Sequence, residues 1–108
     1  MAKSNMQGKV CLVTGSSSGI GKVTARELAK MGATVVIVCR NRTKGEAAQA
    51  EIKAASGNAQ VNLIVADLSE LSEVRRVASE FKQNYSQLHV LVNNAGELTA
   101  STRSPLMG

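Results

Sequence analysis

A glycine-rich segment is the feature of this sequence best suited to chemistry. It covers residues 14–21, with the sequence Thr-Gly-Ser-Ser-Ser-Gly-Ile-Gly, and it lies between an apolar run that resembles a strand and a segment that resembles a helix. Glycines let a backbone turn tightly and approach an anion closely, and the first N–H groups of the helix then face that anion. The segment therefore predicts a phosphate-binding turn.

The spacing of the glycines narrows the kind of phosphate site. A nucleoside-triphosphate loop of the form G-x-x-x-x-G-K-[ST] needs glycine at position 16 and Ser or Thr at position 23. The chain has Ser16 and Val23 there. The common dinucleotide spacing G-x-G-x-x-G fails as well, because the glycines stand at 15, 19 and 21. The turn lies between a strand and a helix, as in a dinucleotide site, but its glycines have neither of these two spacings.

The end of the next apolar run bears on which dinucleotide would bind. Sites that hold NAD use a carboxylate about 20 residues beyond the glycines to bind the ribose 2′-OH. Cys39 stands at that place here, followed by Arg40 and Asn41. A neutral residue followed by arginine suits a ribose 2′-phosphate, because the guanidinium pairs well with phosphate oxygens. The sequence predicts NADP over NAD. The alternative is that Arg40 and Arg42 are only solvated residues at a strand end.

Four short apolar runs must position these residues. They are Val10–Thr14, Val35–Cys39, Val61–Val65 and Leu88–Val92, and they start 25, 26 and 27 residues apart. They are rich in β-branched residues and lack strict alternation, as is typical of strands buried on both faces of a parallel sheet. The segments between them are predicted to be helical. The order β-α-β-α-β-α-β predicts an α/β fold with a doubly wound parallel sheet (Rossmann), present as a truncated half.

Each predicted helix has an apolar stripe. The stripe of the first is Ile20, Thr24, Leu28 and Met31. The second has a thin face of Ala48, Ile52 and Ala55. The third carries Leu71, Val74, Ala78, Phe81 and Tyr85.

Cap signals set the expected helix ends. Gly32 suits a left-handed end of the first helix. Residues 43–46 fit a capping box at the start of the second, and residues 56–58 end it. Ser69 is the expected N-cap of the third. We expect a tail over residues 1–8, a dinucleotide-binding half-domain over 9–96 and a loop over 97–108.

Composition excludes several classes of function. The 108 residues allow one domain or part of one, and 44% hydrophobic content excludes disorder. The net charge of +5 comes from scattered basic residues without interleaved aromatics, so nucleic-acid binding is not expected. No apolar window reaches membrane-spanning length, and the first residues do not resemble a signal peptide. We therefore expect no membrane span and a cytoplasmic or other reducing intracellular setting.

The two cysteines give no sign of a disulfide or a zinc site. Cys11 lies near the start of one predicted strand and Cys39 ends the next, so parallel strands would hold them at opposite ends, too far apart for a disulfide. Their spacing fits no zinc pattern. Both are expected to be core residues.

Three segments of the sequence resemble motifs of the short-chain dehydrogenase/reductase family. Residues 14–21 match its Thr-Gly-x-x-x-Gly-hydrophobic-Gly, and Asp67-Leu68 match its Asp-hydrophobic pair after the third strand. Asn-Asn-Ala-Gly at 93–96 matches the same four residues of the family after the fourth strand. The resemblance covers about residues 8–96. Residues 8–14 and 88–96 look like the retinol-dehydrogenase-like branch.

The resemblance implies contacts with the diphosphate and the adenosine ribose. Gly15, Gly19 and Gly21, with Ile20 in the same turn, would line the diphosphate. Ser17 and Ser18 would offer hydroxyl donors near the ribose or its 2′-phosphate. Arg40 would bind that phosphate with help from Asn41.

It also implies contacts at the two ends of the cofactor. Asp67 and Leu68 would contact the adenine. Asn93, Ala95 and Gly96 would run under the adenosine and nicotinamide riboses and help to order the central strands.

The resemblance implies hydride exchange between NADP(H) and a small-molecule carbonyl or alcohol. In the family this chemistry needs a Ser and a Tyr-x-x-x-Lys pair that lie well beyond the Asn-Asn-Ala-Gly segment. The single tyrosine here is Tyr85, and the residue four positions on is His89. Tyr85 is expected to pack in the core. No catalytic residue is assigned, and this chain alone is expected to bind cofactor at best.

Two other functions stay open. One is a non-catalytic nucleotide-binding or regulatory module that pairs with another chain. The other is a different doubly wound protein such as a methyltransferase, but that would need an acidic residue where Cys39 stands. The family's usual oligomer contacts lie largely in helices that are absent here. The fourth strand would be an exposed edge, so we expect residues 1–108 alone to be marginally stable and prone to aggregation.

Overall fold

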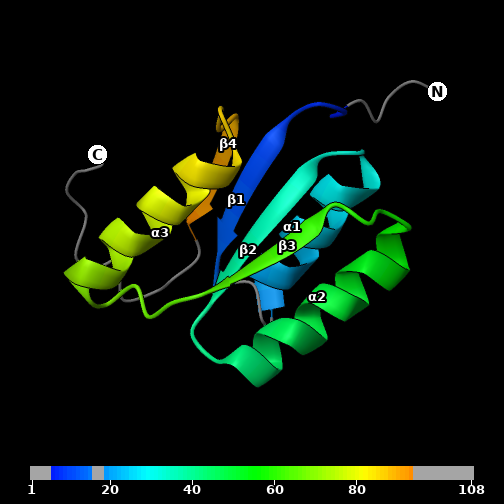
Figure 1. Ribbon diagram of the computed structural model, residues 1–108. Coiled ribbons are helices and arrows are strands. Elements are labelled where there is room, and N and C mark those ends of the chain that lie inside the picture. Colours follow the sequence, from blue (N-terminus) through cyan, green and yellow to red (C-terminus); the bar gives the residue numbers. More distant parts are fainter. Residues whose placement is uncertain (1–5, 16–18, 94–108) are drawn as a thin grey trace.

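The chain alternates strands and helices. The computed structural model (Figure 1) describes residues 6–15 and 19–93. Its elements are β1 (Val10–Thr14), α1 (Gly19–Lys30), β2 (Thr34–Cys39), α2 (Arg42–Ser56), β3 (Val61–Val65), α3 (Leu71–Asn84) and β4 (Val90–Asn93).

The four strands form one parallel sheet in the order β3-β2-β1-β4. The chain moves outward from β1 to β3 and then crosses back to place β4 on the other side of β1 (Figure 1). This confirms the predicted doubly wound sheet. Ligands of such sheets bind at the carboxyl ends of the strands, where the strand order reverses. In this sheet the reversal lies between β1 and β4.

Helices cover both faces of the sheet, with α1 and α2 on one face and α3 on the other (Figure 1). On the first face, buried strand residues pack against Ala25 and Ala29 of α1 and Ala48 and Ile52 of α2. On the second, β2 and β3 pack against Val77 and Phe81 of α3. The core is almost entirely aliphatic, as the composition predicts.

All three predicted apolar stripes were wrong in part. Ile20 is 77% exposed, and α1 instead buries Gly21, Ala25 and Ala29. A row of small residues lets the helix lie close to the sheet, and the large Ile20 side chain is left in solvent. Leu71 is 65% exposed in the same way, because α3 meets the sheet through Val77 and Phe81. In α2 the predicted Ala55 is exposed.

The N-caps predicted for α2 and α3 differ from those in the structure. Helix α2 begins before the expected capping box, because the Asn41 Oδ1 accepts the Lys44 N–H at 2.9 Å. Helix α3 has Glu70 as its N-cap, without a side-chain hydrogen bond, while the Ser69 hydroxyl is bound to Asp67. The predicted left-handed glycine is confirmed at Gly32, with a φ of 92°. Helix α2 ends within the predicted residues 56–58, and its C-cap Gly57 is left-handed as well.

Strand β4 begins two residues later than predicted. The residue before it, His89, donates its N–H to the Val10 carbonyl, and its Nδ1 accepts the Val10 N–H at 2.9 Å. A side chain thus takes the place of a strand partner at this end of β1. At the other end, β4 extends to Asn93.

The outer edge of β3 is partly covered by side chains. The Gln60 carbonyl and the Ala66 N–H bond to β2, so the alternate peptide groups, at Val61, Leu63 and Val65, face away from the sheet. Gln49 of α2 donates to the Val61 carbonyl at 2.8 Å. A side chain of α3 does the same at Val65, as described below.

Both cysteines are free and buried. Cys11 lies opposite Val35, four residues from Cys39 along β2, which confirms that the two thiols stand at opposite ends of adjacent strands. Burial raises the pKa of the Cys11 thiol. Among residues 6–15 and 19–93, no helix has the length and apolar character needed to cross a membrane.

Candidate dinucleotide site

The carboxyl ends of the strands bring most of the predicted site residues to one edge of the sheet. The Gly15 N–H bonds to the Val38 carbonyl at 3.0 Å, and the Ala66 N–H bonds to the Cys39 carbonyl at 2.9 Å. The first residues beyond β1 and β3 are therefore bonded to the last two residues of β2. Residues Gly15, Arg40 and Asp67 share this edge with Asn93, the last residue of β4.

Two glycines of the predicted turn have backbone angles that favour glycine. Gly15 and Gly19 both have a φ of 63°, in the left-handed region. A Cβ at Gly19 would meet nothing within 4 Å, so the backbone angle, and not lack of space, calls for glycine there. Gly21 is buried within the first turn of α1, and the exposed Ile20 precedes it. The predicted Ser17 and Ser18 lie outside the described residues.

Arg40 and Asn41 follow β2 directly. Arg40 is exposed, and it lies close enough to Asp67 for its charge to help lower the pKa of that carboxyl group. The Asn41 side-chain oxygen caps α2. The family resemblance implies that Asn41 helps to bind the phosphate. In the structure its side chain is the N-cap of α2.

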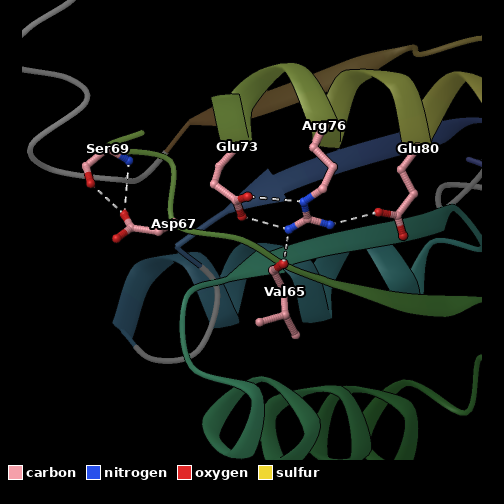
Figure 2. Close-up of polar contacts among 6 residues, drawn as sticks. All are labelled: Val65, Asp67, Ser69, Glu73, Arg76 and Glu80. Carbon is pink, nitrogen blue, oxygen red and sulfur yellow. Dashed lines mark hydrogen bonds and ion pairs between the residues drawn. The ribbon is translucent and has the colours of Figure 1, made fainter. Parts of the chain in front are cut away.

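Asp67 sits in the turn between β3 and α3. Its Oδ1 accepts two hydrogen bonds from Ser69, one from the hydroxyl at 2.7 Å and one from the N–H at 3.1 Å (Figure 2). These bonds, first of all the one from the hydroxyl, hold the pKa of Asp67 below its ordinary value, and Arg40 adds to the effect. The carboxylate is charged near neutral pH. Leu68 packs against the α3-side core.

An arginine that the sequence analysis missed supports this turn. Arg76 of α3 donates from Nη2 to the Val65 carbonyl at 2.6 Å and to Glu73 at 2.8 Å (Figure 2). Its Nη1 donates to Glu80 at 3.2 Å. Pairing with Arg76 lowers the pKa of Glu73, and pairing with Glu73 raises that of Arg76. The signal that could have found the group is its helical spacing, i to i+3 and i+4.

Thr14 and Asn93 join β1 to β4 at the same edge. Thr14 is only 5% exposed, and its hydroxyl donates to the Asn93 Oδ1 at 3.0 Å. This contact links the carboxyl ends of the two neighbouring strands. The predicted Ala95 and Gly96 lie outside the described residues.

The side chains of Tyr85 and His89 have structural contacts. The Tyr85 ring lies 4.9 Å from that of Phe81, between centroids, and its hydroxyl accepts a hydrogen bond from Asn62 near the start of β3. His89 binds the Val10 N–H. In the part of the chain that the structure describes, no cluster of His, Cys, Asp and Glu is arranged to hold a metal ion.

Comparison with known proteins gives the same family as the motifs. The family described as short chain dehydrogenase matches residues 9–106. Retinol dehydrogenase 12 of Bos taurus is 51% identical over 89 residues, which are 82% of this chain and 28% of that protein. Dehydrogenase/reductase SDR family member 13 of Homo sapiens is 45% identical over 92 residues, 85% of this chain and 24% of that protein. The chain thus spans about a quarter of the length of these relatives.

Solved structures show the same likeness. The Pseudomonas aeruginosa RhlG/NADP active-site complex superposes with a TM-score of 0.77 at 34% identity, over 84% of this chain and 36% of the other. L-sorbose reductase from Gluconobacter frateurii, complexed with NADPH and L-sorbose, gives a TM-score of 0.78 at 34% identity, over 85% and 35%. The motifs, the doubly wound sheet and these matches agree: the chain belongs to the short-chain dehydrogenase/reductase family of oxidoreductases and has retinol-dehydrogenase-like relatives.

Proposed function

We propose that this chain forms the NADP(H)-binding part of an oxidoreductase that exchanges hydride between the nicotinamide and a carbonyl or alcohol. One observation carries the choice of cofactor. Arg40 follows β2 directly and lies near Asp67, while the preceding position holds the neutral Cys39 in place of a carboxylate. A cation without a neighbouring acid at position 39 favours a ribose 2′-phosphate over a ribose diol.

The residues of the glycine turn fit a diphosphate. Gly15 and Gly19 have the left-handed angles of a tight turn, and the first N–H groups of α1 follow at once. Such a helix start stabilises an anion through its free N–H groups and its dipole. In this proposal Gly21 and Ile20 complete the turn, and Ser17 and Ser18 supply hydroxyl donors.

The start of α2 fits the 2′-phosphate. Its first turn contains Arg42 and Lys44 and no acidic residue. Basic residues oppose the helix dipole at this end, so helix stability alone does not explain them. Arg42 is partly neutralised by Glu46 at 3.6 Å. We assign the phosphate to Arg40, with Asn41 beside it.

The remaining contacts follow the length of the cofactor. Asp67 and Leu68 would hold the adenine, and Asn93, Ala95 and Gly96 would lie under the riboses. The bound nicotinamide would supply the hydride. The two solved relatives described above are complexes with NADP and with NADPH, which supports the same cofactor here.

The chemistry needs more than residues 1–108. The sequence holds no Tyr-x-x-x-Lys, and its one tyrosine packs against Phe81. We therefore propose that residues 1–108 alone bind cofactor without turnover. A reducing intracellular setting, consistent with the two free thiols, is part of the proposal.

A direct titration tests the choice of cofactor. Quenching of protein fluorescence or calorimetry would compare NADPH with NADH on the complete gene product. We expect NADPH to bind more tightly, and Arg40→Ala to weaken NADPH by about 10- to 100-fold, the value of lost charged hydrogen bonds, with NADH nearly unchanged. Arg75→Ala, at an exposed position of α3 outside the site, is the matched control and should leave the binding of both cofactors unchanged. Equal or tighter binding of NADH by the unaltered protein would refute the proposal.

A regulatory module that pairs with another chain remains the second candidate. The observation in its favour is Leu91, which is 60% exposed on β4 at the edge of the described sheet. The coding sequence beyond Gly108 separates the two. An in-frame Ser and Tyr-x-x-x-Lys favour the oxidoreductase, and a stop codon favours the module.

A further inference from the structure

Arg76 is held in one orientation by its own helix. Its Nε and Nη2 donate to the two carboxylate oxygens of Glu73, at 3.3 and 2.8 Å, and its Nη1 donates to Glu80 at 3.2 Å (Figure 2). A two-armed pair of this kind fixes the plane of the guanidinium. The side chain is 45% exposed, so these contacts, and not burial, hold it in place.

The fixed guanidinium reaches the end of β3. Its Nη2 donates to the carbonyl of Val65, the last residue of the strand, at 2.6 Å. This carbonyl faces away from the sheet. On the opposite side, the next N–H, that of Ala66, donates to the Cys39 carbonyl. The peptide group between Val65 and Ala66 is therefore bound from both sides.

This doubly bound peptide carries the turn to Asp67. One side is tied to Cys39, the residue before Arg40, and the other to α3 through Arg76. The Asp67 carboxylate accepts a hydrogen bond from the hydroxyl of Ser69, two residues before the start of α3. The position of Asp67 relative to Arg40 is thus set by contacts on both sides of the strand end.

We propose that Arg76 is a positioning residue for the cofactor site: held by Glu73 and Glu80, it fixes the end of β3 and so places Asp67 to receive the adenine. It acts through the Val65 carbonyl, without touching the cofactor. The inference rests on the proposed function, because it needs the adenine to lie against Asp67.

The role has a distinct signature in binding. NADPH and NADH carry the same adenine, so loss of Arg76 weakens both by the same factor. Loss of Arg40 weakens NADPH alone. A ligand without adenine, reduced nicotinamide mononucleotide, does not contact Asp67 and keeps its affinity. General damage to the fold would weaken every ligand.

The test is Arg76→Met in the complete gene product, with Arg75→Met as the matched control on the exposed neighbouring position. Calorimetry would measure NADPH, NADH, 5′-AMP and reduced nicotinamide mononucleotide. We expect Arg76→Met to weaken the first three by a common factor of about 2- to 30-fold, the usual range for indirect coupling. Reduced nicotinamide mononucleotide should bind unchanged, Arg76→Lys should restore part of the loss, and Arg75→Met should have no effect.

Three outcomes would overturn the inference. They are unchanged binding of NADPH and NADH by Arg76→Met, a loss confined to NADPH, or an equal loss for the mononucleotide. If Arg76→Met does not fold, Glu80→Gln removes one anchor and should give a smaller loss of the same pattern. Failure of the unaltered protein to bind either dinucleotide would refute the proposed function instead, and would be seen before any variant is made.

Discussion

The Thr14 hydroxyl lies 3.0 Å from the Asn93 Oδ1 and donates a hydrogen bond to it. The two residues are 79 positions apart and end β1 and β4, the neighbouring strands between which the strand order reverses. A buried hydroxyl thus joins the carboxyl ends of the strands on either side of the candidate site. The first prediction follows from it.

Thr14→Val keeps the shape of the side chain and removes the donor. We expect the free energy of unfolding to fall by about 1 kcal/mol, the net value of a hydrogen bond, because the Asn93 oxygen loses this partner. Hydrogen exchange of the β4 amides should also become faster. Thr34→Val, at the half-buried start of β2, is the matched control. Equal stability losses in the two variants would contradict the prediction.

Gly45 allows α2 to lie close to the sheet. A Cβ at this buried position would stand 2.8 Å from the Leu63 Cδ1 and 3.2 Å from the Cys39 Cβ. Alanine favours a helix interior by about 1 kcal/mol, yet we expect Gly45→Ala to destabilise by about 1–3 kcal/mol through overpacking.

Urea unfolding would measure the effect of Gly45→Ala. The control is a double-mutant cycle with Leu63→Ala, which clears the space that the new methyl group needs. We expect Gly45→Ala to cost less in the Leu63→Ala background. A stabilised Gly45→Ala protein would show that the helix can move outward at no cost.

The ionisation of Asp67 makes the stability of the fold depend on pH. Its pKa is lowered in the folded protein, chiefly by the Ser69 hydroxyl. Such a group adds stability above its unfolded pKa, near 4, and that stability is lost as the pH falls through the lower folded value. Ser69→Ala should raise the folded pKa of Asp67. Carboxyl carbon NMR titration measures it, with Ser72→Ala as the control, and an unchanged pKa would rule out the Ser69 contact as its cause.

Asn58 ties three segments together. Its Nδ2 donates to the Ala29 carbonyl at 3.0 Å and to the Ala33 carbonyl at 2.8 Å, and its Oδ1 accepts the Gln60 N–H at 2.8 Å. We expect Asn58→Ala to lower the free energy of unfolding by about 2 kcal/mol.

Asn58→Asp separates the two halves of this contact. It keeps the acceptor for Gln60 and removes both donors, so it should recover only part of the loss. Thermal unfolding measures both variants. A full recovery by Asn58→Asp would mean that the Ala29 and Ala33 carbonyls do not depend on this side chain.

The strands, and the residues at their carboxyl ends, could be predicted because strands buried on both faces of a parallel sheet are continuous apolar runs in the sequence. The run Val61–Val65 was predicted to the residue. Helix faces were harder to predict. An apolar stripe that includes Ile20 fits the helical period, but small residues such as Ala25 and Ala29 decide which side packs closely. Hydrophobicity alone does not identify them.

Structural features of the candidate site were predictable where local backbone geometry requires them, and not where they depend on a distant side chain. The turn at Gly15 and Gly19 follows from local geometry. The ion pairs of Arg76 follow the helical spacing, but its bond to the Val65 carbonyl depends on where α3 lies relative to the end of β3, which no local pattern contains. The N-cap role of Asn41 could not be predicted either, because an N-cap and a phosphate ligand both use a short polar side chain.

The side chains on the outer edge of β3 have a consequence for how the sheet can grow. Two of its outward carbonyls, those of Val61 and Val65, are already bonded, one to Gln49 from the α2 side and one to Arg76 from the α3 side. A further strand approaching this edge would have to displace an amide and a guanidinium before it could pair. Natural sheets resist edge-to-edge aggregation by such obstacles. The two side chains make β3 a poor template for another strand, so we expect no further strand to pair with this edge.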